Sequence, residues 1–92
     1  MGNNYESAVV TAQEAMKSYP FSIYLEEYQI TILRARYEFA LRSTLQTQPE
    51  RYRMVVDEYF NYTNTFPNGK YIAEADSYYK EAQSKIDVLP TT

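Results

Sequence analysis

The chain holds little of the material from which enzymes build active sites. Its 92 residues include no histidine and no cysteine, and no glycine-rich phosphate loop occurs. The usual general bases, nucleophiles and phosphate cradles are therefore missing. The adjacent carboxylates Asp57 and Glu58 would point about 100° apart on a helix, and we expect them on a solvent-exposed face. The sequence predicts a protein that is not an enzyme and that needs no cofactor or metal.

Arginine is confined to the middle of the chain, where it could form a charged binding surface. All five arginines lie between positions 34 and 53, where Glu38 and Glu50 are the acidic residues, while the remainder of the chain is acidic. We prefer the interpretation that they form surface pairs along a helix, such as Arg53 with Asp57, which stabilise little. The alternative is a docking patch for an acidic partner segment at Arg51 and Arg53, because guanidinium groups pair with carboxylates through two bonds.

Tyrosine is the most over-represented residue, with 11 of 92 positions. The preferred interpretation places these tyrosines at half-buried helix corners, with the ring buried and the hydroxyl in water. The alternative is that some of them line a concave groove that receives a peptide or a partner helix. The candidates for that groove are Tyr24, Tyr28, Tyr59, Tyr62 and Tyr78, of which Tyr59 and Tyr62 are the ones we select as partner-binding residues.

Composition and charge limit the class of protein. With 45% hydrophobic and 23% charged residues, residues 1–92 fit one small globular domain rather than a membrane span or a disordered segment. The net charge of −3 argues against nucleic-acid binding, because phosphates attract a positive field. The residues before Tyr5 lack a signal-peptide pattern. We therefore expect a fragment of a longer protein whose targeting signal lies upstream.

An internal repeat becomes visible when the chain is shifted against itself by 47 residues. The matched pairs include Tyr5 with Tyr52, Val9 with Val56, Tyr19 with Phe66, Pro20 with Pro67, Tyr24 with Tyr71, and Leu25 with Ile72. Each copy reads as a helix, an aromatic-proline break and a second helix. The predicted fold is therefore all-α, with about four helices in two stacked antiparallel hairpins of the tetratricopeptide type.

The spacing of apolar residues predicts where these helices begin and end. A stripe at i, i+3 and i+4 runs from Tyr5 to Tyr19, where Pro20 ends the helix. Ser22 is the expected N-cap of a second helix, which runs to about Leu45 and is contacted from two sides. The third helix begins near Pro49 and the fourth near Asn68 or Gly69. The first hairpin is expected over about 4–46 and the second over about 49–87.

Two aromatic-proline corners, "YPFSIY" and "FPNGKY", are the structural sites that should shape this fold. The proline prevents a continuous helix, the aromatic residue before it should fill the inner corner, and the tyrosine four residues after it should pack back across the junction. The corner residues are Tyr19, Pro20, Tyr24, Phe66, Pro67 and Tyr71. Because stacked repeats usually need three or more units, we expect an apolar face on the first or fourth helix to be covered by a missing neighbour or a second copy.

The same corners resemble those of a known family. "YPFSIYLEE" and "FPNGKYIAEA" are similar to the aromatic-Pro-x-Ser-x-Tyr-x-x-Glu-Ala corners of outer-membrane assembly lipoproteins of the BamD type. The stretch "PERYRMVVDEYFNYTNTFPNGKYIAEADSYYKEAQSKI" resembles the C-terminal repeat of the Bacteroidetes members. The chain departs from the pattern at Tyr28, where alanine is usual, and at Gly69, where serine is usual.

The resemblance implies a non-enzymatic scaffold on the periplasmic face of the bacterial outer membrane, in the machinery that assembles β-barrel proteins. Its partners would be other protein subunits of that complex and not nucleic acid. Membrane association would occur only through a lipid anchor outside this chain. The alternative is a generic tetratricopeptide adaptor or cell-envelope coordinator that binds peptides or protein C-termini. A homo-oligomer formed through an exposed repeat face is a further expectation.

Overall fold

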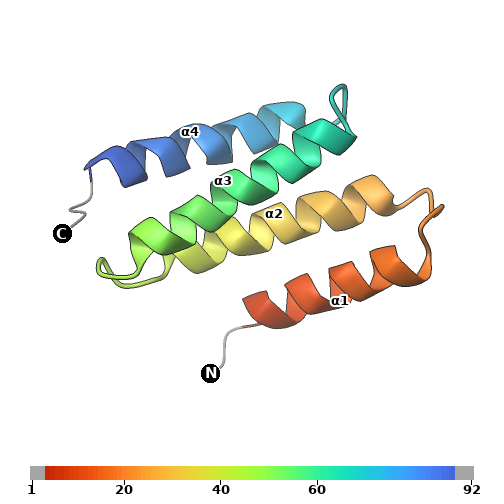
Figure 1. Ribbon diagram of the computed structural model, residues 1–92, viewed down its shortest axis with the longest axis horizontal. Coiled ribbons are helices and arrows are strands. Elements are labelled where there is room, and N and C mark those ends of the chain that lie inside the picture. Colours follow the sequence, from red (N-terminus) through yellow and green to blue (C-terminus); the bar gives the residue numbers. More distant parts are fainter. Residues whose placement is uncertain (1–3, 89–92) are drawn as a thin grey trace.

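The computed structural model describes residues 4–88, which form four helices joined by three short loops (Figure 1). The helices are α1 (Tyr5–Ser18), α2 (Leu25–Leu41), α3 (Gln48–Thr65) and α4 (Ile72–Val88). No strand occurs within the described range. Consecutive helices run antiparallel and follow one another across a slab of 43 × 32 × 17 Å. The predicted all-α fold of stacked helical hairpins is confirmed.

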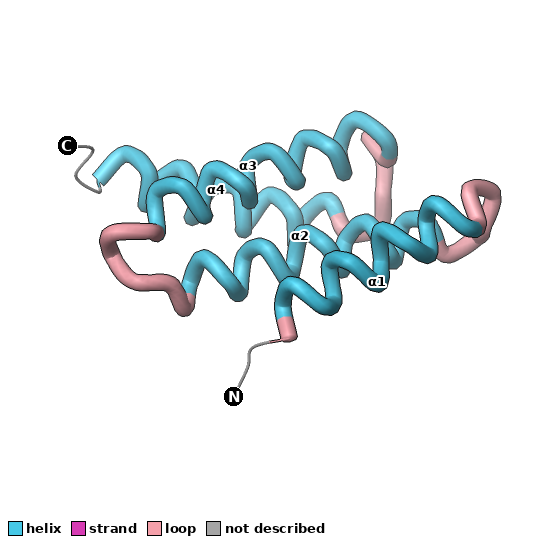
Figure 2. Tube along the Cα trace, turned by 60° about the horizontal axis from the view of Figure 1, so that its bottom comes forward, coloured by secondary structure: helices cyan, strands magenta, loops and turns pink. Residues whose placement is uncertain are grey.

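Both aromatic-proline corners lie at the same end of the molecule, and the α2–α3 loop lies at the other end (Figure 2). The residue before each proline lies outside the α-helical region, which the proline ring disfavours at this position. Its backbone angles are φ −131° and ψ 67° at Tyr19, and φ −128° and ψ 68° at Phe66. The two copies therefore share the backbone of the corner, and any difference between them lies in the side chains.

The second helix is shorter than the sequence predicted, because it ends at Leu41 and not near Leu45. The Ser43 hydroxyl donates a hydrogen bond of 2.6 Å to the carbonyl oxygen of Phe39, and the Ser43 N–H donates one of 3.1 Å to Ala40. Serine hydroxyl groups that bond back to the preceding turn compete with helix continuation. Residues 42–47 consequently form the α2–α3 loop.

The predicted starts of the second and fourth helices are also wrong by a few residues. The Ser22 Oγ accepts a hydrogen bond of 3.0 Å from the Tyr24 N–H, so this serine shapes the turn before α2, which begins at Leu25. In the second copy, the Gly69 N–H donates to the Phe66 carbonyl in an equivalent turn. Each corner therefore uses about six residues, and α4 begins after it.

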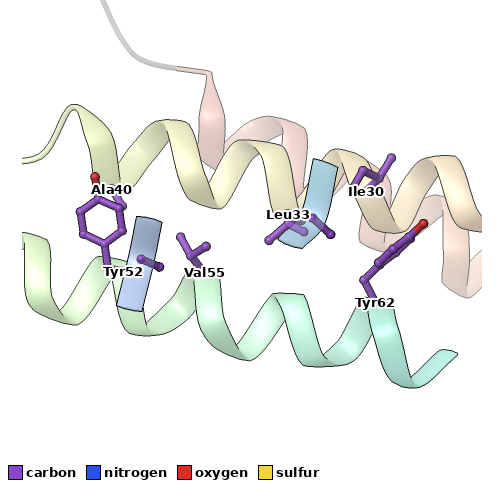
Figure 3. Close-up of a cluster of buried hydrophobic side chains, with 8 residues drawn as sticks. Ile30, Leu33, Ala40, Tyr52, Val55 and Tyr62 are labelled. Carbon is purple, nitrogen blue, oxygen red and sulfur yellow. The ribbon is translucent and has the colours of Figure 1, made fainter. Parts of the chain in front are cut away.

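α2 is the central helix of the molecule. Its Ile30 and Leu33 pack in the larger core cluster with α3 and α4, whereas Ile32 and Ala35 pack in a smaller cluster against α1. Figure 3 shows the larger cluster between Ile30, Leu33 and Ala40 of α2 and Tyr52, Val55 and Tyr62 of α3. The expectation that the second helix is contacted from two sides is confirmed.

Candidate functional site

The second corner, residues 66–71, is locked by the start of α2. The Tyr62 hydroxyl donates a hydrogen bond of 2.7 Å to Glu26 Oε2, and the same carboxylate oxygen accepts one of 2.7 Å from the Lys70 N–H. The Tyr71 N–H donates to the Tyr62 hydroxyl at 3.0 Å. The ammonium of Lys70 lies 2.6 Å from Glu27 Oε2 and holds the pKa of that carboxyl below its usual value.

Phe66 and Tyr71 also pack against the larger core cluster. At the second corner, the aromatic residue before the proline and the tyrosine four residues after it therefore both contact the core.

The first corner, residues 19–24, has no such covering. Four of its side chains are mostly exposed: Tyr19 at 65%, Phe21 at 96%, Ile23 at 85% and Tyr24 at 56%. We call these four residues the corner patch. The expectation that Tyr19 and Tyr24 pack into the junction is wrong. The physical reason is that the second corner is covered by the helix of the preceding hairpin, and no helix precedes α1 within residues 4–88.

The tyrosines proposed for a concave groove do not form one. Tyr62 is fully buried in the core, so its assignment as a partner-binding residue is wrong. Tyr59 stacks on Tyr79 at 4.4 Å between ring centres and donates a hydrogen bond of 2.7 Å to Asp76. This hydrogen bond is the main reason that the pKa of Tyr59 is raised to about 12. Tyr59 therefore joins α3 to α4.

Tyr78 has a comparable role between α4 and α2. Its ring stacks on Tyr37 with 4.6 Å between the ring centres, and its hydroxyl donates to Glu74. Burial is the main reason that its pKa is raised to about 12. Glu74 also receives two hydrogen bonds from Arg34, of 2.6 and 2.8 Å, which lower its pKa. Three of the five candidate tyrosines, Tyr59, Tyr62 and Tyr78, thus donate their hydroxyl groups to carboxylates. The preferred interpretation, which placed the hydroxyl groups in water, is wrong for these three.

The two arginines proposed for a docking patch lie in different surroundings. Arg53 is exposed, and no ion pair joins it to Asp57 in the part of the chain that the structure describes. Arg51 is half-buried, with its guanidinium carbon 4.1 Å from the centre of the Phe39 ring. It lines a cavity beside the α2–α3 loop that Arg53 does not line.

A groove of about 430 Å³ separates α1 from α3, with α2 as its floor. Its lining is rich in carboxamide groups, which can donate and accept hydrogen bonds with a peptide backbone. The lining residues are Gln13, Met16, Gln29, Ile32, Glu58, Asn61, Asn64 and Thr65. We call this the amide groove. Residues of α1, α2 and α3 all contribute to its lining.

Glu58 is one of the residues that line the amide groove, and it is only 8% exposed. The expectation that Glu58 lies on a solvated face is wrong, whereas its neighbour Asp57 is exposed as expected. Glu58 Oε2 accepts hydrogen bonds from Gln29 at 2.8 Å and from Asn61 at 3.2 Å. Its other oxygen lies 3.7 Å from Arg36 Nε. A buried carboxylate needs such partners, and two of the three, Gln29 and Arg36, come from α2, which the sequence could not place beside Glu58.

Sequence reasoning did not find the amide groove. One signal was present, since Asn61 and Asn64 are three residues apart and share a face of α3. Their counterparts on α1 and α2 have no recognisable spacing relative to them. The groove therefore depends on how α1 and α3 flank α2.

Residues 4–88 contain no cluster of acidic or other ligating side chains that could hold a metal ion, and none of their helices is long and apolar enough to cross a membrane. Residues 4–88 form three surface features: an exposed apolar corner, an amide groove and a cavity beside the α2–α3 loop. Compared with known proteins, the chain matches no family model, and no curated protein matches it significantly.

Proposed function

We propose that this chain is a non-enzymatic scaffold that binds other proteins through its uncovered repeat surface. The corner patch is the observation that carries the proposal. Apolar side chains gathered at one place on a small soluble fold are typical of surfaces that are covered by another protein. The second copy supports this reading, because Asn68 and Lys70 stand where the first copy has Phe21 and Ile23.

The resemblance of the two corners to BamD-type lipoproteins supplies the biological setting of the proposal. In that setting the chain belongs to a periplasmic scaffold of the machinery that assembles β-barrel proteins in the outer membrane. Its partners are other protein subunits of the assembly complex. A signal peptide that ends in a lipidated cysteine, upstream in the parent gene, would support this setting.

The double variant Phe21→Asn, Ile23→Lys tests the proposal, since it gives the first corner the residues of the second. The immobilised chain and the variant are each exposed to a periplasmic extract of the native host, and the retained proteins are identified by mass spectrometry. The chain should retain outer-membrane assembly subunits, and the variant should lose them. Its thermal stability should change by less than about 0.5 kcal/mol, because both side chains are exposed.

Two results would contradict parts of the proposal. Equal retention of every protein by the chain and by the variant would exclude the corner patch as the binding surface. Retention that depends on the patch, but of proteins unrelated to β-barrel assembly, would leave the scaffold and exclude the assembly role.

The amide groove favours a second candidate, an adaptor that binds extended peptides. Its volume of about 430 Å³ lies in the range of ordinary ligand sites. The variant Asn64→Ala should then lose peptide binding while the corner-patch variant keeps it. Peptide binding that the corner-patch variant loses and Asn64→Ala keeps would favour the scaffold.

A further inference from the structure

The α2–α3 loop lies beside a half-buried arginine that has no acidic partner. The Phe39 ring covers one face of the Arg51 guanidinium, and Nη1 donates a hydrogen bond of 3.1 Å to Ser43 Oγ. Within residues 4–88, no carboxylate lies at ion-pair distance from Arg51. Because a charge withdrawn from water is costly unless an opposite charge compensates it, Arg51 is placed to receive an anion.

Stacking on Phe39 also sets the direction in which Arg51 can bind. The N–H groups of a guanidinium lie in its plane, so a ring on one face leaves them at the edge. That edge matches a carboxylate, which accepts two parallel hydrogen bonds. Ser43 occupies one of these donors and fixes the orientation of the fork.

Arg51 opens into a cavity of about 330 Å³ between the start of α1, the end of α2 and the α2–α3 loop. We call this the elbow cavity. Besides Arg51, its lining comprises Tyr5, Phe39, Arg42, Ser43, Thr44 and Thr47. The hydroxyl groups of Thr44 and Thr47 lie 3.1 Å apart, and Gln48 Nε2 donates to the Ser43 carbonyl at 3.0 Å. The loop is therefore held in place by its own hydrogen bonds.

Arg42 brings a second positive charge to the elbow cavity. Its pair with Glu38 is 3.5 Å long and joins two exposed side chains, so it stabilises little and is easily exchanged. The two arginines of α2 are engaged differently, since Arg34 has two hydrogen bonds to Glu74 and Arg36 faces buried Glu58. The elbow cavity thus combines two arginines that can accept a new acidic partner, Arg42 of the α2–α3 loop and Arg51 of α3.

We propose that the elbow cavity binds an acidic side chain of a protein partner, with an adjacent apolar side chain packed against Phe39 and Tyr5. The proposal rests on the proposed scaffold function and names the partner chemistry at a second surface. Arg51 and Arg42 supply the charge, and the loop hydroxyls supply neutral donors. The aromatic wall and the volume exceed what a bare inorganic anion can use, and the volume is typical of a ligand pocket.

A titration of the ¹⁵N-labelled chain, followed by NMR, tests this directly. The probe is the capped peptide acetyl-Gly-Leu-Asp-Gly-amide, and its matched control carries asparagine in place of aspartate. The aspartate peptide should shift the amide signals of Ser43 and Thr44, and the asparagine peptide should bind about tenfold more weakly or worse. Equal binding of the two peptides would overturn the proposal.

Three arginine variants identify the site. Arg51→Gln should weaken binding of the aspartate peptide by about tenfold, and the exposed Arg42→Gln by a smaller factor. Arg53→Gln is the matched control, because it removes the same charge two residues from Arg51 at a position that does not line the cavity. Its effect should not exceed about twofold at 0.15 M salt. Equal effects of Arg51→Gln and Arg53→Gln would show nonspecific attraction and overturn the site.

Inorganic phosphate separates a peptide site from a general anion site. Phosphate should shift the same signals only at concentrations well above those of the aspartate peptide, and equal affinity would overturn the peptide assignment. The corner-patch variant Phe21→Asn, Ile23→Lys should bind the peptide as the unchanged chain does. Failure of the aspartate peptide to bind would therefore exclude the elbow cavity as a binding site and leave the corner-patch proposal unchanged. Failure of the corner-patch variant to alter partner retention would contradict only the proposed function.

Discussion

Tyr52 and Tyr62 lie on the same helix and are both fully buried, but their hydroxyl groups have opposite surroundings. The Tyr62 hydroxyl donates to Glu26 and accepts from the Tyr71 N–H. The Tyr52 hydroxyl has no hydrogen-bond partner among the described residues. Residue type and burial alone therefore do not say what a tyrosine contributes to this fold.

Replacing Tyr62 by phenylalanine should lower the free energy of unfolding by about 2–3 kcal/mol, because it removes a bond to a carboxylate and leaves a backbone N–H without its acceptor. Tyr52→Phe is the matched control and should leave stability unchanged or raise it by up to about 1 kcal/mol. Urea denaturation followed by circular dichroism measures both. Similar losses for the two variants would show that the hydrogen bonds of the Tyr62 hydroxyl do not determine the cost, because phenylalanine keeps the ring in both.

High pH should weaken the fold through the same hydroxyl groups. The pKa values of Tyr59, Tyr62 and Tyr78 are raised to about 12, whereas tyrosine in an unfolded chain titrates near 10. The folded state thus favours protonated tyrosine. The contribution of these tyrosines to the free energy of unfolding is complete below about pH 10 and is lost as the pH rises towards 12.

Urea denaturation at pH 9 and pH 11.5 measures this loss, with tyrosinate absorbance as the record of ionisation. Tyr62→Phe should show a smaller difference between the two pH values than the unchanged chain. An equal difference would indicate that Tyr62 does not contribute to the loss.

At the scale of the elements, the two corners share a backbone and differ in what covers them. The second corner is bound by Glu26 and Glu27 at the start of α2, and the first corner exposes its apolar side chains. Gly69 belongs to this difference. Its φ is not positive, so its small size and not its flexibility matters. A Cβ at this position would overlap Glu26 Oε2 and the Tyr62 hydroxyl.

Gly69→Ala should therefore lower the free energy of unfolding by about 1–3 kcal/mol, which is usual for an added methyl group in a tightly packed place. Tyr62 is fully buried and cannot turn away, so the hydrogen bonds at Glu26 must lengthen. Ser22→Ala, the equivalent position of the first corner, should cost less than about 1 kcal/mol, since it removes one exposed hydrogen bond. Thermal unfolding of the two variants would contradict this reasoning if their midpoints were lowered equally.

At the scale of the whole molecule, α1 is the helix with the fewest neighbours. It packs on α2, and it makes no backbone approach to α3 or α4 in the described structure. Its fully buried residues are Val9 and Ala12, which are small, whereas α3 buries Tyr52, Val55 and Tyr62. The amide groove runs along the side of α1 that α3 leaves open.

We expect α1 to open separately from the rest of the fold, since its small apolar contact is lost at a lower free energy than the main core. Native-state hydrogen exchange should show α1 amides at least about tenfold less protected than those of α3, a difference of about 1.4 kcal/mol. Val9→Ala should accelerate exchange in α1 and leave α3 unchanged. Equal protection in both helices would mean that the chain unfolds as one cooperative unit.

Local signals in the sequence were sufficient for the helices and their order. Apolar residues at i, i+3 and i+4 indicate helices from the local sequence alone. Pro20 and Pro67 interrupt these helices whatever the tertiary structure. The repeat then predicts hairpins, because its two copies have the same pattern of helix, corner and helix. The ends of the helices were less predictable. At Ser43, a hydrogen bond from the side-chain hydroxyl to the Phe39 carbonyl competes with continuation of the helix, and the two alternatives differ little in free energy.

The sequence by itself determined the all-α class, the pairing of helices around two aromatic-proline corners and the shortage of catalytic side chains, since these follow from residue type and short-range spacing. Only the tertiary structure decided that the second corner is covered and the first exposed. It also decided that Glu58 is buried and that Arg51 lacks an acidic partner. These features depend on residues far apart in the chain, such as Glu26 and Lys70, whose contact exists only once α2 has packed against the following hairpin.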